Sequence, residues 1–226
     1  MVVVEPQFDK KIMEGLRDRT LRKLGYGTGL GVDPMIVRTL DDVLDTATRV
    51  ARLKGIYRVL PVLGTGKSGV ETQAGVIRSA MFTRLVDICS GNPSIVFMIA
   101  TIGEELEDIG RANPFLFNQL VYDTVGSELT EIMADLLEAD CKEKADNSGL
   151  QLGSRFSPGY CDWSLEGQGI IFSSLDASLI NVRLTSHLVM VPNKSISAIA
   201  VVAEEMPFAA PCTFCRSRDC PWRRSP

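Results

Sequence analysis

Residues 94–102 form a continuous apolar run, Ser-Ile-Val-Phe-Met-Ile-Ala-Thr-Ile, and this run constrains the fold more than any other segment. Asn92-Pro93 precedes it and Gly103 follows it. A run of this length without polar alternation is typical of a strand that is buried on both faces of a sheet. We therefore expect a central buried strand over 94–102.

Apolar residues at helical spacing predict the main helices. We expect helices over residues 8–24, 33–53, 77–89 and 114–143. In the second of these, Asp33 is the expected cap and Pro34 lies in the first turn. The predicted buried stripe of the longest helix consists of Phe117, Val121, Val125, Leu129, Ile132 and Leu136. Gly126 interrupts this helix at a cost of about 1 kcal/mol relative to alanine. Its presence suggests close approach by another backbone or by a ligand.

The remaining segments predict strands and one short helix. Residues 57–63 are expected to form a strand, and Asp162 to cap a helix that runs to about Leu175. Residues 187–191 and 196–202 are expected to pair as a hairpin around Pro192-Asn193-Lys194. Because alternation is weak in both of these strands, we expect most of the hairpin to be buried, with His187 as a core or sheet residue.

A glycine-rich segment, Gly64-Thr65-Gly66-Lys67-Ser68, invites comparison with a phosphate-binding loop. That pattern requires a further glycine five residues before Gly66, where this chain has Pro61. No convincing helix follows whose N-terminus would hold a phosphate. We therefore expect a turn here and no ATP site.

Composition excludes several classes of function. The 226 residues carry a net charge of −4 with a pI of about 5.2, which argues against a nucleic-acid partner. The first six residues are too poor in apolar side chains for a secretory signal, and no run reaches the roughly 18 apolar residues of a membrane span. Six cysteines without an export signal indicate a reducing compartment. We expect a cytoplasmic protein with one large domain.

Residues 155–160, Arg-Phe-Ser-Pro-Gly-Tyr, combine groups suited to ligand binding. Pro158-Gly159 predicts a tight turn in which Gly159 takes positive φ and lets a ligand approach the backbone. Arg155 offers a planar guanidinium suited to a carboxylate, and Tyr160 offers a flat ring and a hydroxyl. A plain surface turn is the alternative interpretation.

The order of several motifs resembles the reactivation domain of cobalamin-dependent methionine synthase and its stand-alone relatives. In that family an RxxPGY turn binds S-adenosylmethionine, and here Arg155–Tyr160 match it. The resemblance covers about residues 20–205, and it includes Leu24-Gly25-Tyr26, Tyr57-Arg58-Val59, Ala100–Gly103 with Leu106-Glu107, Gly126-Ser127 with Glu131, Leu184–Pro192, and Ser195-Ile196-Ser197. It implies an α+β domain with a twisted, mostly antiparallel sheet flanked by helices.

The resemblance also implies a site and a role. Arg155 would bind the ligand's carboxylate, the backbone of Ser157, Pro158, Gly159 and Cys161 would line the ligand, Tyr160 would pack against it, and Glu131 would face its positive charge. The implied function is reductive remethylation of the cobalamin or corrinoid cofactor of a separate methyltransferase, most simply a methionine synthase lacking this domain. The implied electron donor is a protein such as a flavodoxin. Methyl transfer to cobalt moves no proton, so no general base is expected.

The C-terminal segment holds three clustered cysteines, Cys212, Cys215 and Cys220. Three thiolates within nine residues suit zinc or an iron–sulfur cluster, although such sites usually take four ligands. Cys89, Cys141 and Cys161 are candidates for a fourth. The alternatives are a metal-bearing redox adaptor for a corrinoid protein, with a vestigial ligand pocket, and a tail that binds no metal. We therefore divide the chain into a domain over 1–205 and a cysteine-rich tail over 206–226.

Overall fold

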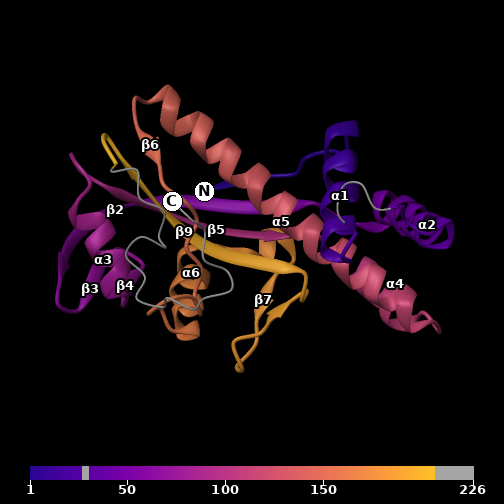
Figure 1. Ribbon diagram of the computed structural model, residues 1–226. Helices are drawn as coiled ribbons and strands as arrows, with labels where there is room; N and C mark the ends of the chain where they lie inside the picture. Colours follow the sequence, from indigo (N-terminus) through magenta and orange to yellow (C-terminus); the bar gives the residue numbers. More distant parts are fainter. Residues whose placement is uncertain (27–30, 207–226) are drawn as a thin grey trace.

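The computed structural model describes residues 1–26 and 31–206. Within these ranges the chain forms nine strands, six α-helices and two short 3₁₀-helices (Figure 1). The strands are β1 (Val2–Val4), β2 (Lys54–Gly66), β3 (Gly69–Thr72), β4 (Gly75–Ile77), β5 (Ser94–Thr101), β6 (Gln151–Leu152), β7 (Arg183–Leu184), β8 (Met190–Val191) and β9 (Ser195–Ala203). The helices are α1 (Lys10–Lys23), α2 (Pro34–Val50), α3 (Ala80–Asp87), α4 (Glu105–Ala112), α5 (Leu116–Asn147), η1 (Leu165–Gly167), α6 (Gln168–Ser174) and η2 (Ala177–Ile180).

One antiparallel sheet organises the domain, in the order β4-β3-β2-β5-β9-β6 with β1 added along β2. β5 pairs with β2 on one side and with β9 on the other over its whole length. Every residue from Ile95 to Thr101 is buried. The central buried strand and the α+β fold with an antiparallel sheet are both confirmed, and β5 ends one residue before the predicted boundary.

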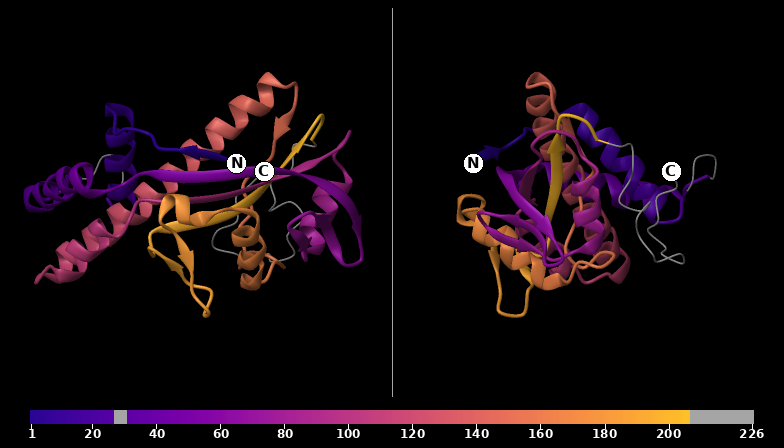
Figure 2. Two further views of the ribbon diagram at one scale, coloured as in Figure 1. Left: turned by 180° about the vertical axis from the view of Figure 1, so that it is seen from behind. Right: turned by 90° about the vertical axis from the view of Figure 1, so that its left-hand side faces the viewer.

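The two faces of the sheet carry separate hydrophobic cores, and helices lie on both faces (Figure 2). Helices α1, α2 and α5 pack on one face, and α3, α6 and η2 pack on the other. Because side chains alternate along a strand, β5 contributes Val96, Met98 and Ala100 to the first core and Ile95, Phe97 and Ile99 to the second. This arrangement explains why the sequence of β5 is apolar at every position.

Three long helices match the predictions closely. α1 and α2 lie where expected, and the Asp33 carboxylate accepts a hydrogen bond of 2.7 Å from the Met35 amide at the start of α2. α5 spans 32 residues, yet neither it nor any other helix in the described part of the chain is long and apolar enough to cross a membrane. Of its predicted stripe, Phe117 is the exception, with 39% of its surface exposed.

The exposure of Phe117 has a geometric cause. Lys194, which immediately precedes β9, hydrogen-bonds to Asp123 on α5, and Ser195 pairs with the last residue of β5. Residues of α5 before Asp123 therefore extend past the end of the central strands, where the sheet no longer covers them. α4, which the sequence did not predict, projects further in the same direction (Figure 1).

The predicted hairpin of 187–191 with 196–202 is wrong. β8 pairs with β7 in a separate two-stranded ribbon, whereas β9 pairs with β5 and β6. β9 is buried on both faces, as expected, but its partners are β5 and β6 of the large sheet and not β8. His187 lies exposed in the turn of the β7–β8 ribbon, which corrects its predicted place in the core.

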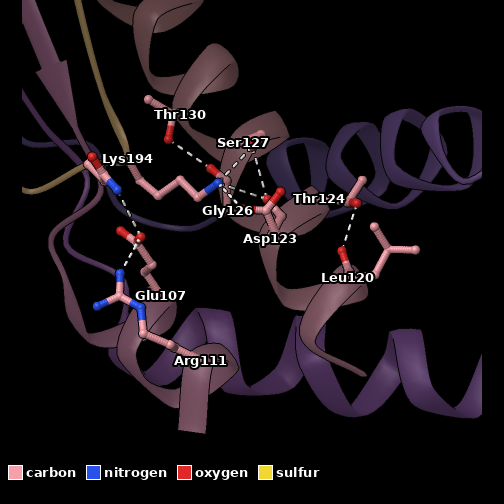
Figure 3. A network of polar contacts seen from close by, with 10 residues as sticks. Glu107, Arg111, Leu120, Asp123, Thr124, Gly126, Ser127, Thr130 and Lys194 are labelled. Carbon is pink, nitrogen blue, oxygen red and sulfur yellow. Dashed lines mark hydrogen bonds and ion pairs between the residues drawn. The ribbon is translucent and has the colours of Figure 1, made fainter. Parts of the chain in front are cut away.

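Gly126 is approached closely by a lysine side chain, and not by the backbone or ligand that the sequence suggested. A Cβ atom at Gly126 would lie 3.2 Å from Cε of Lys194. The Lys194 ammonium donates to the Asp123 carboxylate at 2.6 Å, to the Asp123 carbonyl at 3.1 Å and to the Ser127 hydroxyl at 2.9 Å (Figure 3). The glycine therefore makes room for a clamp between α5 and the turn before β9.

The predicted glycine-rich turn is present, whereas the helix that was expected after it is shorter than predicted. Gly66–Gly69 forms the turn between β2 and β3, which confirms a glycine-rich turn. The helix predicted over 77–89 is shorter, because Ile77 ends β4 and the Ser79 hydroxyl caps α3 through the Phe82 amide at 3.0 Å.

Asp162 caps a helix, but not the one that follows it in sequence. Its carboxylate accepts bonds from the Ser79 hydroxyl at 2.6 Å and from the Met81 amide at 3.0 Å, both at the start of α3. Ser164 instead caps the 3₁₀ turn that leads into α6. Asp162 thereby ties the segment after the Pro158-Gly159 turn to the helix packed beneath it.

We expect Asp162→Ala to lower the free energy of unfolding by about 1 kcal/mol, because the first turn of α3 loses an acceptor. Asp162→Asn, which keeps one carbonyl oxygen, should lose less. Urea denaturation monitored by circular dichroism measures both. Equal stability of the alanine variant and the wild type would contradict this role.

Candidate functional site

The segment before the Pro158-Gly159 turn follows the open edge of β9. β6 pairs with the end of β9, the Gly153 amide donates to the Val201 carbonyl at 2.8 Å, and Phe156 and Ile199 exchange two backbone bonds of 2.8 Å. The chain is thus held in extended geometry up to Phe156. The turn follows directly from the sheet edge.

Extended geometry sends Arg155 and Phe156 to opposite faces of the sheet. Phe156 is 3% exposed and stacks between Phe82 at 5.7 Å and Trp163 at 5.3 Å between ring centroids, within the second core. The guanidinium of Arg155 lies on the side of α5. Anchoring Phe156 therefore fixes the face on which Arg155 lies.

Arg155 makes ion pairs with three carboxylates of α5. Its guanidinium lies 2.5 Å from the Asp135 carboxylate, 2.6 Å from that of Glu138 and 3.6 Å from that of Glu131. The Arg155 side chain is only 13% exposed, whereas the acidic side chains are 29–52% exposed. The planar fork suits several carboxylates at once.

α1 adds a second arginine to this cluster. Arg19 donates to the other oxygen of Asp135 at 2.7 Å. Glu131, Asp135 and Glu138 together carry three negative charges against the two positive charges of Arg19 and Arg155. These five side chains, which we call the Arg155 cluster, therefore carry one net negative charge.

The turn itself has the predicted backbone geometry. Gly159 has φ +89°, the Tyr160 amide donates to the Ser157 carbonyl at 3.3 Å, and the Gly159 amide donates to the Trp163 carbonyl at 2.8 Å. Pro158 is buried and Ser157 half-buried, whereas Gly159, Tyr160 and Cys161 are exposed. Cys161 has φ +54°, a conformation that few residues other than glycine adopt.

The structure brings some predicted site residues together and leaves others untested. Arg155 and Glu131 are neighbours, and residues 157–161 form one continuous turn beginning two residues after Arg155. Sequence analysis missed Asp135, Glu138 and Arg19. The two acids follow Glu131 at positions i+4 and i+7, on the same face of a helix, so their spacing was a usable signal.

The surface has two hollows to consider, one next to the Arg155 cluster and one away from it. One of about 300 Å³ is lined by Arg19, Arg22, Lys23 and Glu128, and it adjoins the Arg155 cluster through Arg19. Another of about 690 Å³ lies near the ends of β2 and β5, where Arg52, Thr101 and Pro192 are among its lining residues. No residue of the predicted site lines the larger hollow, so we place the candidate site at the Arg155 cluster and the turn.

A second polar group lies further along α5, at the edge of the first core. The Tyr57 hydroxyl donates to Asp140 at 2.7 Å and accepts from Lys144 at 2.7 Å, and the Tyr57 ring is 3% exposed. Burial raises the pKa of Tyr57 to about 12. The hydroxyl therefore stays protonated at neutral pH and links Asp140 with Lys144, whose side chains are 30% and 53% exposed.

The predicted metal ligands Cys212, Cys215 and Cys220 lie outside the described residues. Within residues 1–26 and 31–206, no group of three or more histidine, cysteine, aspartate or glutamate side chains is arranged to hold a metal ion. Metal binding by the tail remains a prediction.

Comparison with known proteins bears on the fold. No model of a protein family and no curated protein sequence matches the chain. Among the solved structures that do match is the crystal structure of the MetH reactivation domain bound to AdoHcy, with a TM-score of 0.63 and 16% identity over 93% of this chain and 81% of that chain. This chain has the fold of that reactivation domain. The fold implied by the sequence resemblance is thereby confirmed.

We expect Arg155→Ala to lower the free energy of unfolding by about 1–3 kcal/mol, between the values for exposed and for buried ion pairs. Without the guanidinium, the three carboxylates on one face of α5 would repel one another. Added salt should narrow the difference from the wild type by screening this repulsion. Urea denaturation at low and high ionic strength measures both effects.

Arg111→Ala is the matched control, because Arg111 pairs with Glu107 in a similar way but is 68% exposed. Its loss should change stability by less than about 0.5 kcal/mol. An Arg155 variant that behaves like the Arg111 variant would contradict a structural role for the Arg155 cluster.

Proposed function

We propose that this protein binds S-adenosylmethionine and supports reductive remethylation of the cobalamin or corrinoid cofactor of a separate methyltransferase. The observation that carries this proposal is the contact of Arg155 with Glu131 beside the Arg-Phe-Ser-Pro-Gly-Tyr turn, in a domain with the MetH reactivation fold. The solved domain of that fold binds AdoHcy, the demethylated form of S-adenosylmethionine. A methionine synthase lacking its own reactivation domain is the simplest partner.

In the proposed complex, Arg155 binds the ligand's carboxylate by charge-assisted hydrogen bonds. Asp135 can release Arg155 and keep Arg19, to which it already bonds at 2.7 Å. The net negative charge of the Arg155 cluster favours the ammonium and sulfonium groups, with Glu131 the most exposed of its carboxylates. The backbone of residues 157–161 then lines the nucleoside, with Tyr160 against it.

In the reaction that we propose this protein assists, the partner's cobalt gains one electron and one methyl group. The electron comes from a donor protein such as a flavodoxin, and the methyl group leaves the sulfonium, which becomes a neutral thioether. No proton moves, so the site needs no base. The residues of this chain bind the methyl donor and orient it, which is the usual contribution of a protein when a cofactor supplies the chemistry.

One observation favours a different function. Arg155 is engaged by three acidic side chains of α5, which would have to yield to a ligand carboxylate and would not yield in a vestigial ligand pocket. The protein would then serve a corrinoid protein as a redox adaptor, with zinc or an iron–sulfur cluster at Cys212, Cys215 and Cys220. Iron in anaerobically purified protein, together with no thermal shift on addition of S-adenosylmethionine, would favour this alternative.

We expect Arg155→Ala to abolish S-adenosylmethionine binding in isothermal titration calorimetry, because the ligand's carboxylate would then face Glu131, Asp135 and Glu138 without the guanidinium between them. Arg111→Ala should bind like the wild type, because Arg111 pairs only with Glu107 and Asp108 on α4 among the ion pairs of the described residues. Circular dichroism establishes that both variants are folded at the temperature of the titration. Unchanged affinity of the Arg155 variant would refute the proposed site.

We expect saturating S-adenosylmethionine to slow alkylation of Cys161 by iodoacetamide, since the exposed thiol lies in the proposed ligand-binding turn. Peptide mapping by mass spectrometry separates it from the other cysteines. Cys141 is the internal control: it is 4% exposed, and burial raises its pKa to about 12, so at pH 8 it should not react. Identical Cys161 rates with and without ligand would place the ligand elsewhere.

A further inference from the structure

The corner between α4 and α5 exposes five apolar side chains, which we call the corner patch. They are Ile109 (38% exposed), Phe115 (67%), Leu116 (80%), Phe117 (39%) and Leu120 (52%). α4 and this corner project past the end of the sheet in Figure 1 and in the left view of Figure 2. An apolar patch of this kind on a soluble domain marks an interaction surface.

Hydrogen bonds hold the corner in one conformation. The Asn113 carboxamide oxygen accepts from the Phe115 amide at 3.1 Å, and the Gln119 side chain donates back to the Asn113 carbonyl at 2.7 Å. The Gln119 amide also donates to the Phe115 carbonyl at 3.0 Å. The apolar side chains are therefore presented on a fixed backbone.

The flanks of the corner are tied to the turn before β9. The Asn193 side chain donates to the Glu107 carboxylate on α4 at 3.1 Å, and Lys194 donates to Asp123 on α5 at 2.6 Å (Figure 3). Both helices are thus anchored to the domain close to the patch. A surface that is rigid before binding loses little conformational entropy on association.

The α5 part of the corner patch lies on the face of that helix that points away from the core, so nothing within the described residues covers it. Val121 and Val125 are fully buried in the first core, while Leu116 and Leu120, four residues apart, share the outward face. Phe115 lies just before the first turn. No packing within the described residues requires apolar side chains at these exposed positions, because the core of α5 is complete without them.

The size of the patch fits an interface between two copies of this chain. Side chains of this size expose up to roughly 200 Å² each, so the five exposed fractions add up to roughly 500 Å² of apolar surface. A standard interface buries about 800 Å² on each partner, and homodimer interfaces are about 65% apolar, which corresponds to about 500 Å².

Charges beside the patch also suit self-association. Arg111 is 68% exposed, and Asp108 and Asp123 are 63% and 68% exposed. Both signs therefore border the same surface, so two identical copies can meet without a like-charge field between them. From these observations we propose that the corner patch is the contact surface of a twofold-symmetric homodimer. This inference does not depend on the ligand or the reaction proposed above.

Analytical ultracentrifugation of the full chain, in reducing buffer over a range of concentrations, tests the proposal. We expect a species of twice the 24.7 kDa chain mass that dissociates on dilution. Leu116→Glu should raise the dimer dissociation constant at least tenfold, since it buries an unpaired carboxylate at the contact. A glutamate in the first turn of a helix is favourable for the fold.

Leu63→Glu is the matched control, because Leu63 is 61% exposed and lies in β2 away from the corner. It should dimerise like the wild type. Should Leu116→Glu prove unfolded by circular dichroism, Phe115→Ser supplies the same test from outside the helix. A wild type that is monomeric throughout, which would assign the patch to a different protein, overturns the proposal. Corner variants that dimerise as tightly as the wild type overturn it too.

Discussion

Burial of β5 on both faces is the constraint from which the architecture follows. Its residues Ile95 to Thr101 expose almost nothing, so the strand must have neighbours on both edges and helices on both faces. β2 and β9 satisfy the backbone groups, since a buried amide or carbonyl without a partner is costly. α5 covers one face over most of its length, and α3 with α6 covers the other. The two cores meet only through the sheet, so each helix layer is positioned by the same strand.

The candidate site arises where this sheet ends at β9. Phe156 completes two backbone bonds with Ile199 and inserts its ring into the second core, which leaves Arg155 no choice of face. A shift of one residue in this register would exchange the two side chains and bury a guanidinium among aromatic rings. The position of the arginine beside α5 is therefore determined by aromatic packing on the opposite side of the sheet. Asp162 extends this control past the turn by binding the start of α3.

Features that depend on local periodicity were predictable from sequence, and features that depend on distant partners were not. The apolar run of β5 and the stripes of α1, α2 and α5 carry their own signal. The pairing of β9 does not, because an apolar strand is compatible with any apolar neighbour. Asp162 is a residue type that commonly caps the helix that follows it, yet its carboxylate accepts from the amide of a helix about eighty residues earlier. In the site, Arg155 and Glu131 came from motif resemblance and Asp135 and Glu138 had a visible spacing, whereas nothing in the sequence connects Arg19 to them.

The Arg155 cluster also bears on what kind of ligand the proposed site can accept. A ligand carboxylate that takes the place of Asp135 exchanges one ion pair for a similar one, so this contact by itself contributes little net affinity. Asp135 remains bound to Arg19 after the exchange, which limits the cost of its release. What the exchange adds is a further negative charge in a cluster that already has one in excess. A simple carboxylate is therefore disfavoured, whereas a ligand that brings positive charge with its carboxylate compensates for it. S-adenosylmethionine, with an ammonium and a sulfonium beside its carboxylate, meets this requirement, and loss of the methyl group removes the sulfonium charge and with it part of the attraction.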